Sequence, residues 1–396
     1  MKKLAICVLA ILLVSAASVV SWPIAHESTL PALAAPHRAI GALQPRISPA
    51  GDSVAVSHQG AIWRLPREGG VMKRLTDGDG FDIEPAWSPD GKRLVYINSR
   101  TFFAGELRVV DTASGAPQKL PATVTAQGKL HFHPDGERLL GNFQAQGKPE
   151  MLAWFNLKSG ELKPVLNPPR SARRLSLSND GGSIAFVTTL DVPGEQTGND
   201  GPQNDVWRVA AEGGEPERIV RFPARVHDTC WEGDDQSLVV TTDLGGAHYD
   251  LWIIPLANPE RAARRITFGA ADEDRQSVSR DGRWLAYSDN REGSTSLVVR
   301  DSTGYEQTIM VSGLDFGRAT GKLRLKVVEK GTGRPLVARM TLEEKPGKFH
   351  APIGALYRIE RGNGHFYCRE QAELSLPSGV YLEGGCGPIP SFRDAG

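Results

Sequence analysis

The chain lacks the charge pattern of a nucleic-acid-binding protein. Lys+Arg and Asp+Glu number 46 each in 396 residues, and the basic runs do not exceed short pairs such as Arg173-Arg174. Because cations placed against phosphates supply most of the affinity for DNA or RNA, this balance argues against such a partner. We therefore expect no nucleic-acid binding.

Cysteine is also scarce, with four residues in the whole chain. Ile6, which precedes Cys7, is too large for a typical lipoprotein cleavage site, so lipidation is not expected. In an exported chain, Cys368 and Cys386 are the pair near enough in sequence for one disulfide. The sequence leaves open whether that disulfide forms.

One strongly apolar run stands at the start of the chain, from Leu4 to Val20, behind the basic Lys2 and Lys3. Small residues follow at the end of this run, which is typical of a signal peptide. We predict a signal peptide over 1–22 and a linker over 23–40, and hence a periplasmic or secreted protein. The alternative is an uncleaved anchor, because 17 residues are at the lower limit for a membrane span.

What the sequence does contain is a repeat. An apolar residue, a turn of the Ser-Pro-Asp-Gly type and a β-rich run recur six times, most clearly over 87–96. The last turn residues stand at 51, 91, 136, 181, 235 and 282, so the spacings run from 40 to 54 residues. Proline sets the first φ of such a turn, Asp bonds the backbone beyond it, and Gly accepts a positive φ. The longest spacing holds a Gly/Asp/Pro-rich stretch, 190–203, which we interpret as a surface loop.

Each unit carries four short strand signals, two around the turn and two after it. Four strands in 40 to 50 residues are typical of one propeller blade, and a single blade cannot bury both of its faces. The sequence therefore predicts an all-β fold with a six-bladed β-propeller over 41–315.

The Trp87-Ser88-Pro89-Asp90-Gly91 turn, the Asp-x-Trp-x-(Val/Leu) third strand and the closing Arg-Leu-Thr resemble the TolB-like (WD-repeat-like) β-propeller family. This resemblance implies a ring with a central channel that serves as a platform for protein or peptide binding. Related propellers precede catalytic domains in enzymes similar to prolyl oligopeptidase. No Gly-x-Ser-x-Gly nucleophile elbow occurs in the sequence, which argues against that arrangement here.

The repeat stops after residue 315, and we predict a linker over 316–321 followed by a small, truncated β-sandwich-like domain over 322–396. Strands are expected at 322–328, 337–342 and 372–376, and the glycine-rich 384–388 is expected to be irregular. The segment resembles the β module that precedes the metal-dependent hydrolase domain of CehA/McbA-type proteins. That resemblance implies an alternative function: the front part of a split or truncated amidohydrolase-type enzyme whose catalytic domain is missing from this chain.

Two apparent catalytic motifs coincide with repeat positions. Gly51-Asp52-Ser53 is similar to a hydrolase nucleophile block, but its alignment places Ser53 in a strand after a turn. His131 and His133 have a spacing common in metal sites, yet they occupy the positions of Ala86 and Ser88 in the repeat. We therefore expect scaffold roles for these residues, with no metal and no cofactor.

One set of residues suggests a site. Seven positions before the last turn residue, every unit has a polar or charged side chain: Gln44, Glu84, Lys129, Arg174, Asp228 and Arg275. Two positions further on stand Arg46, Ala86, His131, Ser176, Cys230 and Ser277, on the same strand face if the strands are regular. The first set would ring the channel mouth and could hold a charged peptide or protein tail. The alternative is that these side chains pair across blades, as Glu84 with Lys129 could.

The sequence thus favours a non-catalytic, exported, monomeric propeller that binds a protein or peptide through the channel mouth.

Overall fold

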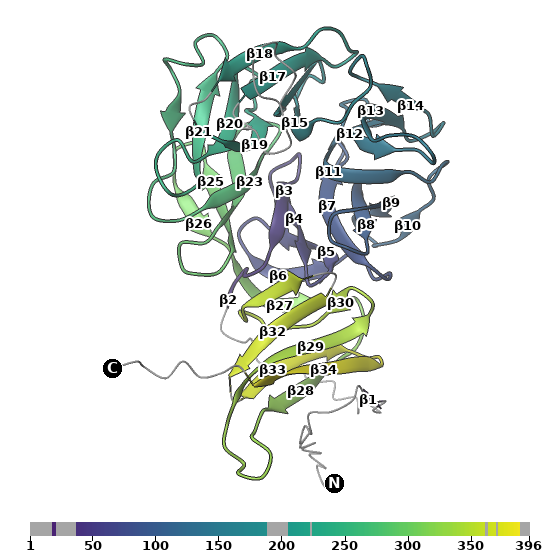
Figure 1. Ribbon diagram of the computed structural model, residues 1–396, viewed down its shortest axis with the longest axis vertical. Helices are drawn as coiled ribbons and strands as arrows, with labels where there is room; N and C mark the ends of the chain where they lie inside the picture. Colours follow the sequence, from purple (N-terminus) through teal and green to yellow (C-terminus); the bar gives the residue numbers. More distant parts are fainter. Residues whose placement is uncertain are drawn as a thin grey trace.

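The computed structural model describes residues 18–20, 37–187, 205–221, 224–360, 363–369 and 371–388. Regular structure in these ranges is entirely β, and they contain no helix able to cross a membrane. Six four-stranded blades form a ring around a central axis, and a small two-sheet domain lies beside the ring (Figure 1). This confirms the all-β class and the propeller followed by a sandwich. Most of the predicted signal peptide and the whole loop 190–203 lie outside the described residues.

The strands of each blade run antiparallel from the axis outward, in sequence order. The innermost strands are β3 (Leu43–Ile47), β7 (Phe81–Trp87), β11 (Thr125–Phe132), β15 (Arg173–Leu177), β19 (Val226–Trp231) and β23 (Glu273–Val278). The second strands are β4 (Ser53–His58), β8 (Arg93–Ser99), β12 (Arg138–Gln144), β16 (Ser183–Val187), β20 (Ser237–Thr242) and β24 (Trp284–Asp289). The third are β5 (Ala61–Pro66), β9 (Ala104–Asp111), β13 (Met151–Asn156), β17 (Asp205–Ala210), β21 (Asp250–Pro255) and β25 (Ser296–Asp301). The outermost are β6 (Gly70–Arg74), β10 (Pro117–Gln118), β14 (Leu162–Pro164), β18 (Glu217–Arg221), β22 (Arg264–Arg265) and β26 (Glu306–Thr308).

The Ser-Pro-Asp-Gly turns join the first and second strands, so all six lie on one face of the ring, which we call the turn face. In β7–β8 the Ser88 hydroxyl donates to the Asp90 carboxylate at 2.6 Å, and Gly91 has φ +69°. In β3–β4, Ala50 takes the place of that aspartate, and Ser48 donates instead to Asp52 at 2.7 Å. Asp52 is therefore a turn residue and Ser53 is the first residue of β4, as their repeat positions predicted.

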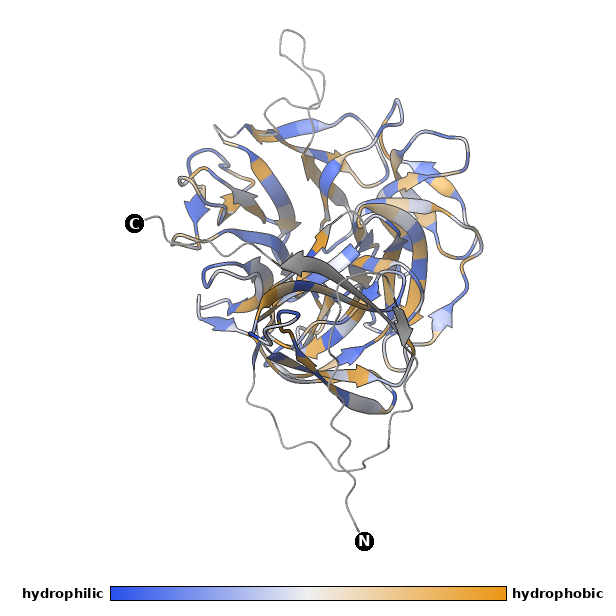
Figure 2. Ribbon diagram, turned by 60° about the horizontal axis from the view of Figure 1, so that its bottom comes forward, coloured by the Kyte–Doolittle hydropathy of each residue, from blue (hydrophilic) through white to orange (hydrophobic). Residues whose placement is uncertain are grey.

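Apolar cores fill the spaces between neighbouring blades. Val54, Val56 and Trp63 of the first blade pack in one cluster with Ala286 and Leu297 of the sixth. Ala55 and Ile62, which point to the other face of the first blade, pack in a second cluster with Leu94 of the second blade. Figure 2 shows hydrophobic residues, in orange, on strands around the ring. Because each blade buries its faces against two neighbours, the ring supplies the burial that a single blade lacks.

The ring closes where the sixth blade meets the first. β27 (Met310–Asp315) leaves the sixth blade and pairs in parallel with β6, and β2 (His37–Arg38) pairs in turn with β27. On the inside, the backbone N–H of Ile47 donates to the Ser277 hydroxyl at 3.2 Å. β27, which follows the last blade, thus covers the exposed edge of β6, the outermost strand of the first blade.

The C-terminal domain packs two sheets around its own core. One pairs β28 (Thr320–Lys326) with β33 (Gln371–Pro377); the other joins β29 (Val337–Lys345), β30 (Lys348–Phe349), β31 (Tyr357–Glu360), β32 (Asn363–Arg369), β34 (Tyr381–Pro388) and β1 (Ser18–Val20). The expectation that 384–388 is irregular was wrong. These residues pair with β29 because glycines still supply ladder hydrogen bonds, with one bulge opposite Ala338 and Arg339.

The register of this sheet separates the two cysteines considered for a disulfide. Cys368 lies opposite Ala338 in β32, and the Cys386 backbone lies opposite Arg339 in β34, so β29 runs between them. Two strand spacings amount to about 9.5 Å, beyond the roughly 7 Å Cα separation that a disulfide tolerates. The Cys368 thiol is free and buried.

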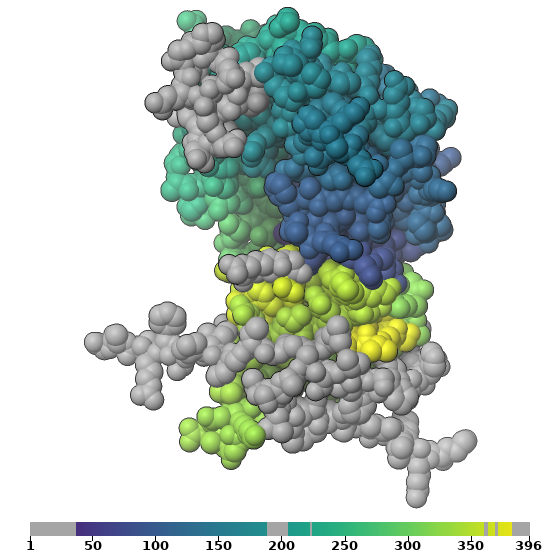
Figure 3. Space-filling view, turned by 45° about the vertical axis from the view of Figure 1, so that its right-hand side comes forward, coloured from purple at the N-terminus to yellow at the C-terminus, as the bar shows by residue number. Residues whose placement is uncertain are grey.

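The small domain docks on the first two blades (Figure 3). It contacts the start of β7 and the β4–β5 turn, at the strand ends opposite the turn face. Lys348 and Asp82 form an ion pair at 3.1 Å with both side chains buried. Arg74 and Glu344 form another at 3.2 Å, also buried. Contacts reach the β4–β5 turn, where Gln59 donates to the Ala351 carbonyl at 3.1 Å. The domain therefore leaves the turn face uncovered.

Candidate functional site

Five of the six predicted site residues lie within bulges of the innermost strands, and Asp228 directly follows the bulge at His227. Every innermost strand shifts register against its neighbour at this point. Four of the residues have positive φ: Gln44 (52°), Glu84 (50°), Arg174 (55°) and Arg275 (62°). In the third blade the positive φ falls on Gly128, beside Lys129. A non-glycine residue in the left-handed conformation costs on the order of 1 kcal/mol of folding free energy. A bulge changes the direction of a side chain, and here the repeated bulges direct polar side chains toward the ring axis.

Glu84 is the centre of one half of the resulting charged layer. Its carboxylate accepts from Gln44 at 3.0 Å, from Arg46 at 2.9 Å and from Arg275 at 3.0 Å. The side-chain amide oxygen of Gln44, Oε1, in turn accepts from the Glu84 backbone N–H at 3.0 Å. Gln44, Arg46 and Glu84 are buried, so water does not replace these bonds.

Lys129 and Asp228 form the other half. Their charged groups approach to 2.5 Å, and the Lys129 ammonium also donates to the Thr229 carbonyl at 2.9 Å. Burial raises the pKa of Asp228, but Lys129, Arg275 and Arg174 outweigh it, so that the pKa lies below its usual value. Burial lowers the pKa of Lys129, and Asp228 offsets part of that effect. The pair therefore closes the axis with opposite charges.

Above this charged layer, on the turn face, lies a cavity of about 160 Å³ that we call the axial pocket. All six blades contribute to its walls, each through the residue two positions beyond the predicted ring: Arg46, Ala86, His131, Ser176, Cys230 and Ser277. Trp87, Phe132 and Trp231 line it as well, and Arg280 lies at its rim. Because the buried layer closes the far end, the pocket opens only toward the turn face.

The polar groups of the axial pocket are mainly hydrogen-bond donors. The hydroxyl oxygens of Ser176 and Ser277 accept backbone N–H groups at 3.0 and 3.2 Å. Neither hydroxyl donates its hydrogen to another residue that the structure describes. The Arg46 Nε–H is buried and likewise has no acceptor within the described part of the chain. No Asp or Glu is among the described residues that line the pocket.

His131 stands in the pocket wall as a neutral ring. Its Nε2 lies 2.9 Å from the Leu175 carbonyl, which can only accept, so Nε2 carries the hydrogen and Nδ1 is an acceptor. Burial, and then the cations Lys129 and Arg46, lower the pKa of His131 to about 3. The ring therefore stays uncharged at neutral pH.

This burial predicts acid sensitivity. Between pH 6.5 and pH 3 the unfolded chain binds a proton at His131 and the folded chain does not, so stability falls as the pH falls through this window. At pH 5 the loss amounts to about 2 kcal/mol. We expect His131→Gln to flatten the dependence of the unfolding free energy on pH between 7 and 5, measured by urea titration. An unchanged slope in His131→Gln would contradict this account of the buried ring.

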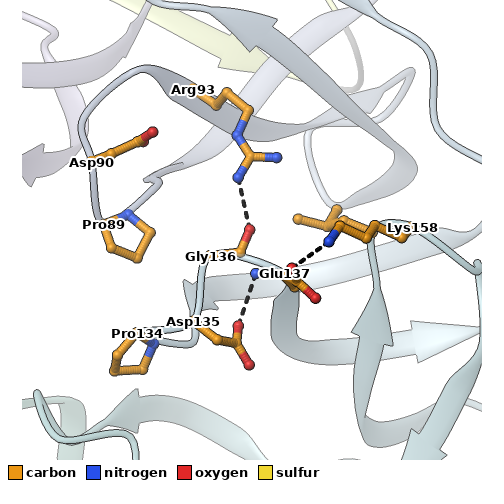
Figure 4. Close-up of a pocket in the computed structure, with 9 residues that line it drawn as sticks. Pro89, Asp90, Arg93, Pro134, Asp135, Gly136, Glu137 and Lys158 are labelled. Carbon is orange, nitrogen blue, oxygen red and sulfur yellow. Dashed lines mark hydrogen bonds and ion pairs between the residues drawn. The ribbon is translucent and has the colours of Figure 1, made fainter.

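A second cavity of about 330 Å³ continues outward from the axial pocket, between the turns of the second and third blades (Figure 4). Pro89 and Pro134 line both cavities. In this outer groove Arg93 donates to the Gly136 carbonyl at 2.7 Å, and Lys158 pairs with Glu137. The two cavities therefore adjoin at these two prolines on the turn face.

The structure brings the predicted ring together, but as a buried layer rather than an open mouth. Only Arg174 and Arg275 are partly exposed, and Lys129 is the one member of the six that lines the axial pocket. The suggested pairing of Glu84 with Lys129 was wrong, because each binds another partner in the layer. Sequence reasoning gave no binding role to Arg46 or Arg280. The available signal was the polar column two residues beyond the ring.

The other candidate motifs do not form a metal site. His131 lines the axial pocket, whereas the His133 ring lies over Trp154 and next to Asp135 in the following turn. Within the described ranges, His, Cys, Asp and Glu side chains do not gather in a group of three that could hold a metal ion.

Comparisons with known proteins support the fold. No protein-family model matches the chain. An 84-residue stretch is 32% identical to a Bacillus subtilis (strain 168) protein described as the uncharacterized peptidase YuxL, covering 21% of this chain and 13% of that protein. Among solved structures, TolB from Acinetobacter baumannii is similar at a TM-score of 0.50 with 16% identity, covering 68% of this chain and 65% of that one. The tricorn protease is similar at 0.53 with 17% identity, covering 73% of this chain and 28% of that one. The chain thus spans less than two thirds of the length of each of these proteins. At identities of 16% and 17%, the similarity to the solved structures is evidence for the fold alone. The propeller has a TolB-like β-propeller fold.

Proposed function

We propose that this protein is a non-catalytic binding platform for a peptide or protein segment, which it holds in the axial pocket of its turn face. The observation that carries this proposal is the pocket on the ring axis, to which every blade contributes a side chain at the same repeat position. A cavity of about 160 Å³ is smaller than the usual pocket for a drug-sized ligand, about 300–1,000 Å³. It suits a short piece of a longer chain that continues across the surface.

The walls agree with such a ligand. Trp87, Phe132 and Trp231 offer apolar surface, and Ser176 and Ser277 offer hydroxyl groups. Aromatic side chains with a few polar groups are typical of peptide-binding surfaces. The small domain docks on the opposite face, so it leaves this approach open.

Two variants at one position test the proposal. Cys230→Trp fills the axial pocket, whereas Cys230→Ser keeps its size. The full chain is immobilised and offered a degenerate pool of hexapeptides, and retained peptides are identified by mass spectrometry. We expect wild type and Cys230→Ser to retain a subset of the pool and Cys230→Trp to lose at least tenfold of that retention. Thermal unfolding of both variants shows that they are folded. Equal retention by all three proteins would contradict the proposal, and so would no retention by the wild type.

An exported location, periplasmic or secreted, belongs to the same proposal and is tested by N-terminal sequencing of the mature protein. The alternative function, the front part of an amidohydrolase-type enzyme, stays a prediction. Reading the coding sequence downstream for a metal-binding His-x-His segment tests it.

A further inference from the structure

The axial pocket has a single opening, and this restricts what can enter it. Gln44, Glu84, Lys129 and Asp228 fill the axis below it and are all buried. A segment from the middle of a chain would have to enter and leave by the same opening. A cavity of about 160 Å³ is too small to hold two stretches of backbone side by side. A chain end or one long side chain meets this constraint.

The chemistry of the floor and walls selects the sign of that group. Arg46, Lys129 and Arg280 line the pocket, and no carboxylate of the described residues does. The Arg46 Nε–H, buried and without an acceptor among the described residues, is the kind of donor that an incoming anion satisfies. The free hydroxyl hydrogen of Ser277 lies on the neighbouring wall, next to the strand of Arg46, and that of Ser176 lies across the ring on the fourth blade. Glu84 and Asp228 already pair with Arg46 and Lys129 from the layer below, so the preference for an anion comes from the unpaired donors of the walls and from the exposed Arg280.

The outer groove provides a path for the residues that precede the chain end. It meets the axial pocket at Pro89 and Pro134 and runs between the turns of two blades (Figure 4). A peptide with its last residue on the axis can therefore lie along this groove without crossing another blade.

Resting on the proposed function, we infer that the axial pocket recognises the carboxyl-terminal residue of its partner, with the terminal carboxylate held by Arg46, Ser176 and Ser277. Charge-assisted hydrogen bonds of this kind are about twice as strong as neutral ones, so the carboxylate would dominate selection. The upstream residues lie along the outer groove.

The test compares hexapeptide pools that differ at the end of the chain. Full-length protein is offered an acetylated degenerate pool with a free terminal carboxylate, the same pool amidated, and a free-acid pool without Asp or Glu. We expect the amidated pool to be retained at least about tenfold less than the free-acid pool, and removal of Asp and Glu to change little. Equal retention of the free-acid and amidated pools overturns the inference but leaves the binding platform standing. Retention that follows Asp and Glu content also overturns it, in favour of an acidic side chain. No retention of any pool overturns both proposals.

A second experiment compares substitutions of two surface arginines, Arg280 at the pocket and Arg283 away from it. Arg280 lines the pocket rim and is exposed, so Arg280→Gln should fold and weaken free-acid binding about threefold. Arg283, three residues on in the same turn region, is 73% exposed and pairs with Asp281 away from the pocket. Arg283→Gln should bind as wild type does. Equal effects of the two variants, or a loss that persists against amidated peptides, would argue against a terminal carboxylate.

Discussion

Glu84→Gln is expected to destabilise the propeller by about 3–5 kcal/mol, because it leaves the buried Arg46 cation without its charged partner. Glu84 accepts from Arg46 at 2.9 Å and from Arg275 at 3.0 Å, and its own side chain is 4% exposed. Glutamine keeps the shape but not the charge, so Arg46 stays buried without compensation. Urea unfolding followed by tryptophan fluorescence measures the loss.

The control for this variant is Glu137→Gln. Glu137 pairs with Lys158 at the surface, where both side chains are about half exposed or more. An exposed pair of this kind contributes about 0–1 kcal/mol, so the control should unfold close to wild type. If Glu84→Gln costs no more than Glu137→Gln, the charged layer does not hold the blades together as described.

Lys348→Met should release the small domain from the propeller, at a cost of about 3–5 kcal/mol. Lys348 is fully buried between the domains, where it pairs with Asp82 at 3.1 Å and donates to the Gly80 carbonyl. Methionine fills a similar volume but leaves the Asp82 carboxylate buried without a cation. We expect calorimetry to show the small domain unfolding at a lower temperature than the propeller.

Lys345→Met is the matched variant in the same hairpin. Lys345 pairs with Asp77 at 3.2 Å, but the two side chains are 34% and 48% exposed. Solvent screens such a pair, so less than about 1 kcal/mol should be lost. A single unchanged transition in Lys348→Met, equal to that of Lys345→Met, would show that the buried pair does not fix the domain.

The ring architecture was predictable because each blade repeats its turn chemistry. The turn residues Ser88, Asp90 and Gly91 each have a distinct role that recurs at fixed spacing, so the period reveals the blades. The fifth unit shows how the pattern survives substitution: Asp235 takes the positive φ, 56°, that glycine takes elsewhere.

The site was only partly predictable, for a local reason. A regular strand repeats its faces every two residues, so Glu84 and Ala86 were expected to share the channel face. The bulge between Ile83 and Ala86 breaks this two-residue alternation, and the Glu84 side chain therefore points into the buried charged layer. Only in the third blade does a glycine, Gly128, mark the bulge. In four other blades Gln, Glu or Arg takes the positive φ, so the residue types there do not predict it.

Partners in the charged layer were not predictable either. Glu84 binds Arg46 and Arg275, which lie 38 and 191 positions away in the sequence. Such pairs form only when the ring closes. The repeat gives each residue its position within its own blade, but it does not determine which residue of another blade it will meet. The docking of the small domain through Lys348 and Asp82 depends likewise on contacts far apart in the chain.

Hydrogen exchange in the presence of a retained free-acid hexapeptide tests the binding site most directly. If the axial pocket holds the peptide, amides at the ends of β3, β11 and β23 and in the turns that follow them should exchange more slowly. The sheets of the small domain should be unaffected. Protection confined to β29 and β34, with the turn face unchanged, would contradict the account.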